Sequence, residues 1–197
     1  VEINVNDISK KLKSTSDADS FKVIIYNSDG GVIIQFENAI DIPDEVELEP
    51  GEYYVVAHSE NYLPAAFENP YYYGRSENFS LENEEYRTVI VNCELANCAV
   101  SIVYSENIKN DFTDYYTTVS IDGYSLTFVK GETRTGYFDL VPLTIEAVLE
   151  YSLTDSSTAT KILSGIIDNP QAKKHYEVHL NTSLADGKAA IVINLDE

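Results

Sequence analysis

The stretch TVIVNCELANCAVSIVY, residues 88–104, decides how the chain is organised, because its apolar pattern changes phase partway along. Cys93 shares odd positions with Val89 and Val91, whereas Cys98 shares even positions with Val100, Ile102 and Tyr104. Neighbouring side chains of a strand point to opposite faces, so this stretch predicts two strands that enter two different cores. We therefore expect two domains, at residues 1–95 and 96–197.

Cys93 and Cys98 are the only cysteines, and each follows the apolar phase of its own strand. Five residues of extended chain span ~16 Å, whereas a disulfide needs Cα atoms within ~7 Å of each other. We interpret them as two small core residues that are not joined. Only a tight reversal at residues 95–97 would permit a disulfide, so the redox compartment stays open.

Alternation with period two continues through most of the chain. FKVIIYNSDGGVIIQF, residues 21–36, predicts a hairpin that turns at residues 28–31. DEVELEPGEYYVVAHSE, residues 44–60, predicts a second strand pair that turns at Pro50–Gly51. Short strands with regular turns are typical of antiparallel sandwiches. The predicted fold is all-β, with two tandem antiparallel β-sandwich domains of Ig-like or Greek-key type.

One short helix is predicted near residues 106–113, with Ser105 as its N-cap and with Ile108 and Phe112 on one face. Farther along, two pairs of segments hint at an internal repeat. LEPGEYYVVAHSE begins at Leu48 and LVPLTIEAVLEYS at Leu140. RTVIVN and YEVHLN then follow in the same order, which predicts domains of similar topology.

The chain is strongly acidic, with 33 Asp and Glu against 13 Lys and Arg and a net charge of −20. Such a field repels phosphate backbones and anionic lipid, so nucleic acid is not an expected partner. Solubility and cation binding both remain open as reasons for the acidity. No run reaches the ~18 apolar residues of a membrane span. The start at Val1, without a signal peptide, suggests a mature or trimmed fragment.

Motifs for catalysis or metal binding are scarce. HYEVH, residues 175–179, has the spacing of a helical zinc site, but its phase is that of a strand. Four residues of strand span ~13 Å, too far for two Zn–N bonds of ~2.1 Å. A nucleophile elbow, a phosphate loop and a calcium loop are all missing. NDFTD, residues 110–114, is either a cation site or a solvated helix end. We expect no enzyme, no catalytic residue, no metal and no cofactor.

Two tyrosine features remain. LEPGEY predicts a tyrosine corner, in which the Tyr53 hydroxyl bonds to nearby backbone. ENPYYYGRSENFS, residues 68–80, is either an edge strand sealed by aromatic rings or a platform for a ligand or partner, since a tyrosine offers a flat apolar face and a polar tip. The candidate binding residues of that platform are Tyr71, Tyr72, Tyr73, Arg75 and Asn78.

Seven short pieces between about residues 45 and 145 resemble, in order, a Bacteroidetes family called domain of unknown function 4493. They are LEPGEYYV (48–55), AFENPYYYG (66–74), CELAN (93–97), DFTDYYTTV (111–119), SLTF (125–128), TGYF (135–138) and PLTI (142–145). HYEVHL, residues 175–180, is similar to fimbrillin-like surface proteins of the same bacteria. The resemblance implies export, with a lipid anchor upstream of Val1, and it supplies no catalytic residue.

These observations lead to one functional expectation and one alternative. We expect a non-enzymatic module at the cell surface or outer membrane, acting in adhesion or as part of a fimbria-like assembly. Its partners would be other surface or fimbrial proteins. The alternative is a glycan-binding surface protein that uses exposed tyrosines.

Overall fold

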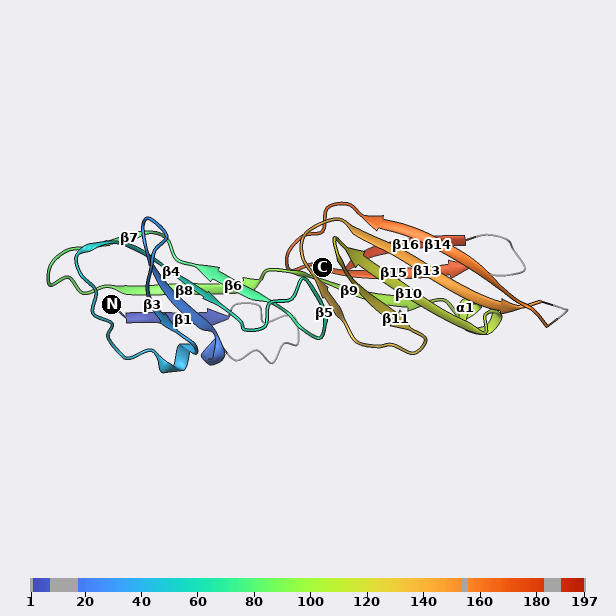
Figure 1. Cartoon of the computed structure of the whole chain (residues 1–197), viewed down its shortest axis with the longest axis horizontal. Coiled ribbons are helices and arrows are strands. Elements are labelled where there is room, and N and C mark those ends of the chain that lie inside the picture. The colour runs from blue at the N-terminus through green and yellow to red at the C-terminus, as the bar shows by residue number, and fades with distance from the viewer. Residues whose placement is uncertain (1, 8–17, 154–155, 183–188, 197) are drawn as a thin grey trace. The chain divides into compact units, whose positions relative to one another are not determined.

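The computed structural model of the chain describes residues 2–7, 18–153, 156–182 and 189–196 (Figure 1). Strands make up most of the described secondary structure, which confirms the predicted all-β class. Contacts within the chain divide it into two compact units. Unit 1 holds the described residues up to Tyr62 together with Pro70–Ala96, and unit 2 holds Leu63–Asn69 together with the described residues from Asn97 onward.

One segment sets these units apart from the expected division at residues 95 and 96. Strand β5 (Ala65–Phe67) lies in the first half of the sequence but pairs with β12 (Gly136–Phe138) of unit 2. Local alternation cannot reveal such a pairing, because the partner strand lies far along the chain. Independent folding of residues 1–95 therefore stays a prediction.

Unit 1 is built on a seven-stranded sheet in the order β1-β8-β6-β4-β2-β3, with β7 also paired to β4. The face that carries Val23, Val55 and Val91 is buried and forms the core of the unit. Two short 3-10 helices, η1 (Ala18–Ser20) and η2 (Ala39–Asp41), accompany the sheet. The strands are β1 (Glu2–Asp7), β2 (Lys22–Asn27), β3 (Val32–Phe36), β4 (Gly51–His58), β6 (Tyr72–Arg75), β7 (Phe79–Leu81) and β8 (Thr88–Leu95).

Two predicted local structures of unit 1 are confirmed, and a third is wrong. The β2–β3 hairpin turns where expected, with Gly30 at φ +83°, and the Tyr53 hydroxyl donates to the Glu49 carbonyl over 2.7 Å. The expected strand before Pro50 is absent, because residues 42–50 form no strand. Val46 is buried there and its immediate neighbours are exposed, so the alternation marks a buried side chain in a segment that is not a strand.

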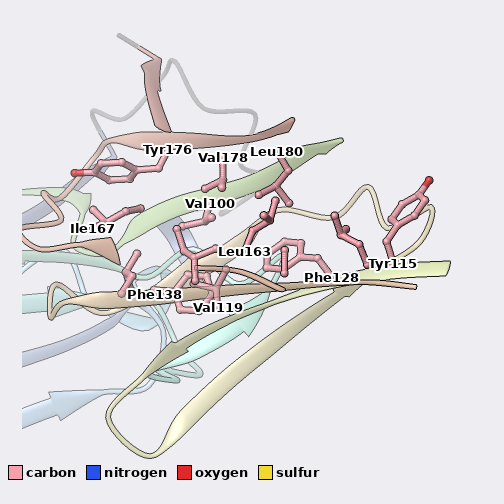
Figure 2. Close-up of a cluster of buried hydrophobic side chains, with 14 of the residues drawn as sticks. Val100, Tyr115, Val119, Phe128, Phe138, Leu163, Ile167, Tyr176, Val178 and Leu180 are labelled. Carbon is pink, nitrogen blue, oxygen red and sulfur yellow. The ribbon is translucent and has the colours of Figure 1, made fainter. Parts of the chain in front are cut away.

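Unit 2 contains two sheets that share a core. One has the order β11-β10-β13-β14 and the other has the order β16-β15-β9-β12-β5. Figure 2 shows Val178 and Leu180 of β15 pointing toward side chains of the other sheet, such as Val119 and Phe128, and Tyr176 belongs to the same buried cluster. The strands not yet bounded are β9 (Cys98–Tyr104), β10 (Asp114–Ile121), β11 (Tyr124–Val129), β13 (Leu143–Ser152), β14 (Thr158–Ile167), β15 (His175–Thr182) and β16 (Ala189–Asp196).

The expectation of purely antiparallel pairing is wrong at two places. Strand β1 pairs in parallel with β8, and β9 pairs in parallel with β15. Parallel neighbours need a long crossover, and the intervening strands of each unit supply one. The pairing also supports the repeat: β2 pairs with β3 and β4 in unit 1, as β10 pairs with β11 and β13 in unit 2.

The change of phase between Cys93 and Cys98 falls between two buried positions: Cys93 is buried in unit 1 and Cys98 in unit 2. As predicted, the two cysteines form no disulfide with each other. The predicted helix is also confirmed, as α1 (Glu106–Asp111). Its N-cap Ser105 accepts a hydrogen bond from the Ile108 amide, and Ile108 is buried in the core of unit 2.

Candidate binding surface

The tyrosine run lies in an interior strand, so the edge-strand interpretation is wrong. Strand β6 pairs with β4 on one side and with β8 on the other. Pro70 precedes the strand and takes no place in its ladder, so its missing N–H does not force β6 to an edge. The side chains of β6 that point away from the core therefore lie between those of β4 and those of β8.

The run divides its side chains between the core and the outer face. Tyr72 is fully buried and its ring stacks on Phe21 with a centroid distance of 5.8 Å. Tyr73 points outward and keeps 42% of its surface exposed. Gly74 points inward, where a Cβ atom would lie 2.5 Å from the Asn92 carbonyl oxygen of β8. Gly74 is therefore a site where two strands approach each other closely.

Arg75 is fixed on the outer face by an aromatic ring and an amide. Its guanidinium carbon lies 4.0 Å from the centroid of the Tyr54 ring. Its Nη2 donates to Asn78 Oδ1 over 2.7 Å. Tyr54 in turn stacks on Tyr26 at 5.0 Å with an interplanar angle of 11°. Each cation–aromatic contact of this exposed kind contributes about 0.5–1 kcal/mol, so the group is partly ordered before any partner arrives.

Tyr71 belongs to a second aromatic group at the start of β6. Its ring meets the Tyr62 ring edge-on at 5.0 Å and lies 6.0 Å from the His58 ring. His58 is also the register partner of Tyr73, so Tyr73 lies beside this group on the outer face. We call the outer-face set the tyrosine face; its members are Tyr26, Tyr54, His58, Tyr62, Tyr71, Tyr73, Arg75 and Asn78.

The structure brings four of the five predicted residues to this face and adds residues that sequence reasoning missed. Tyr72 is the exception, since its buried ring supports the face from beneath. Tyr26, Tyr54 and His58 were missed although their phase could have placed them, because Tyr54 alternates with buried Tyr53 and Val55. Flat rings and a planar guanidinium suit stacking and hydrogen bonding to a partner surface.

The histidines of β15 do not form a metal site with other described residues. His175 and His179 lie on the side of β15 opposite buried Tyr176, as expected. His175 Nε2 lies 2.9 Å from Ser101 Oγ, and His179 Nε2 lies 3.3 Å from Glu177 Oε2. Within the described ranges no three His, Cys, Asp or Glu side chains gather as a metal site, and no helix there is long and apolar enough to cross a membrane.

Comparison with solved structures gives likeness of fold at low sequence identity. A candidate polysaccharide-binding protein from Bacteroides thetaiotaomicron aligns with a TM-score of 0.50 and 12% identity, over 98% of this chain and 96% of that chain. A candidate adhesin from the same species aligns with a TM-score of 0.50 and 8% identity, over 98% of this chain and 94% of that chain. A fimbrial anchor protein from Porphyromonas gingivalis aligns with a TM-score of 0.46 and 10% identity, over 98% of this chain and 95% of that chain. At these identities the likeness concerns the fold alone.

No curated protein sequence matches the chain. The sequence profile of DUF4493, a domain of unknown function, matches residues 1–197. The match covers both units of the structure, including the tyrosine face. The chain therefore belongs to the DUF4493 family.

Proposed function

We propose that this chain is a non-enzymatic cell-surface module, with two β-sandwich domains, that acts in adhesion or as part of a fimbria-like assembly. The tyrosine face is the observation that carries the proposal. It presents exposed Tyr73 beside Arg75, which Tyr54 and Asn78 hold in place. Tyrosine and arginine are the side chains that most often dominate protein interfaces.

The structures of similar fold agree with a surface role. One belongs to a candidate adhesin and one to a candidate polysaccharide-binding protein. The candidate polysaccharide-binding protein supports glycan binding as the alternative function of the same face, because a sugar ring can stack on Tyr73. Both uses place the contact on Tyr71, Tyr73, Arg75 and Asn78, with Tyr72 as their buried support.

Adhesion of protein-coated beads to cultured epithelial cells and to bacterial cells tests the proposal. We expect Tyr73→Ala to lower adhesion at least ~5-fold, since one aromatic contact contributes ~1 kcal/mol, and to leave the melting temperature unchanged. Tyr124→Ala is the matched control, because Tyr124 is 53% exposed but lies in unit 2.

The outcomes separate the two uses of the face. Adhesion that free oligosaccharides abolish would assign the face to glycans, and adhesion that they leave intact supports protein contacts. Equal adhesion by wild-type protein and Tyr73→Ala would exclude the tyrosine face from both roles.

A further inference from the structure

Unit 1 contains an open groove of about 810 Å³ that is lined by both acidic and apolar residues. The lining comes from Ile33 and Ile34 of β3, from Tyr53, and from two segments, residues 45–50 and 81–86. The hydrogen bond from Tyr53 to the Glu49 carbonyl holds the first segment, and a turn closed by Glu82 and Glu85 holds the second. We call it the glutamate groove, after its six glutamates: Glu45, Glu47, Glu49, Glu82, Glu84 and Glu85.

Within the described ranges, no lysine or arginine lines the groove. In the part of the chain that the structure describes, only Glu85 of the six glutamates has an ion-pair partner, Arg87 at 3.6 Å. An adjoining hollow shares Glu45 with the groove and adds Glu2 and Asp44. The whole surface therefore favours a positively charged occupant.

Tyr86 lines both the groove and the adjoining hollow, so the negative charge of both acts on its hydroxyl. Desolvation, together with the carboxylates of Glu2, Glu45 and Asp44, raises the pKa of Tyr86. Tyr86 keeps 58% of its surface exposed, so a cation of a partner can reach it. Elsewhere in this unit Arg75 packs over Tyr54, and an arginine or lysine of a partner can contact Tyr86 in the same way.

The shape of the groove favours a chain over a single ion. Its carboxylates are spread along two segments, and no three of the described acidic or histidine side chains come together as a metal site. Ile33 and Ile34 point to opposite faces of β3, yet both line the groove. The groove therefore reaches the outer edge of β3 at these two residues, and β3 pairs only with β2 among the described strands. An extended peptide can add to such an edge.

We propose that the glutamate groove binds an extended, lysine- and arginine-rich segment of a partner protein. The basic side chains of the segment pair with the glutamates. Their aliphatic stems contact the apolar lining residues Ile33, Leu48 and Leu81, as long basic side chains do on apolar surfaces. The groove is lined by none of the residues of the tyrosine face, so this interaction is separate from the proposed adhesive contact.

Calorimetry with a decapeptide of alternating lysine and threonine tests the proposal on the full chain. The groove variant carries Glu45→Gln, Glu47→Gln, Glu82→Gln and Glu84→Gln. The control variant carries Asp29→Asn, Glu60→Gln, Asp122→Asn and Glu146→Gln, which are exposed and outside the groove. Each set raises the net charge of −20 by four, so the two variants differ only in where charge is removed.

We expect the groove variant to bind the peptide roughly 10-fold more weakly and the control variant to bind within about 2-fold of wild type. Binding of the wild type should weaken as salt rises. Equal losses in both variants would show unspecific charge attraction and overturn the proposal, as would no binding by wild type. If spermine bound the wild type as tightly as the peptide and lost the same affinity in the groove variant, the proposed peptide ligand would be wrong. The ligand of the groove would then be a small polycation. Circular dichroism of both variants confirms that the fold is kept.

Discussion

Removing the hydroxyl of Tyr72 should stabilise the protein. The Tyr72 ring is fully buried against Phe21. Among the described residues its hydroxyl is the one buried side-chain oxygen or nitrogen without a hydrogen-bond partner. Burying an unpaired hydroxyl costs about 1–3 kcal/mol. Since Tyr72→Phe keeps the ring contacts and removes that cost, we expect the free energy of unfolding to rise by about 1 kcal/mol.

The same chemical change at Tyr53 should have the opposite sign, which makes it a matched control. The Tyr53 hydroxyl donates to the Glu49 carbonyl at 2.7 Å, and Tyr53 is itself almost fully buried. Tyr53→Phe should therefore lower the free energy of unfolding by about 1 kcal/mol. Tyr72→Ala removes the ring as well and should cost about 3–5 kcal/mol, because it leaves a cavity in the core.

Urea unfolding followed by far-UV circular dichroism measures all three variants. Tyrosine fluorescence is a second probe, since the chain has 15 tyrosines and no tryptophan. A Tyr72→Phe variant that loses as much stability as Tyr53→Phe would show that the Tyr72 hydroxyl is hydrogen-bonded. The reasoning about this buried group would then be wrong.

Four further expectations concern the strands and the thiols. Gly74→Ala should cost about 1–3 kcal/mol in the same urea assay, because the new Cβ atom would meet the Asn92 carbonyl oxygen at 2.5 Å and force β6 from β8; wild-type stability would contradict that close approach. Cys93 and Cys98 should resist iodoacetamide at pH 8 until the chain unfolds, since both are buried and burial raises the pKa of Cys98 to about 12; mass spectrometry of the treated native protein detects any exception. Burial also raises the pKa of Tyr104 from 10.0 to about 12. As pH rises, the thiol and the phenol ionise in the unfolded chain before they ionise in the folded protein. The stability that the two groups contribute is therefore complete below pH 9 and should fall as pH rises toward 12. The double variant Cys98→Ala with Tyr104→Phe should show a smaller fall in the free energy of unfolding, measured at several pH values. A fragment of residues 1–95 should unfold cooperatively on heating, although it lacks the unit 2 partner of β5, and a broad, non-cooperative transition would count against two folding units.

The sequence by itself determined the features that depend on neighbours along the chain. Alternation placed Val89, Val91 and Cys93 on one buried face, because a strand repeats every two residues whatever it pairs with. Turn chemistry located the β2–β3 hairpin, and capping chemistry located α1 after Ser105. The Tyr53 corner followed from a spacing of a few residues.

Only the tertiary structure decided which strands are neighbours. The parallel pairs β1–β8 and β9–β15 and the transfer of β5 to unit 2 join segments far apart in sequence, and alternation carries no information about a strand's partner. Alternation also could not predict the two surfaces, because each joins segments that are distant in sequence. Tyr26, Tyr54 and Arg75 form one group because β2, β4 and β6 lie side by side. The glutamate groove exists because two distant acidic segments meet beside β3. Long-range pairing depends on the packing of the whole unit, and a single sequence records only its local part.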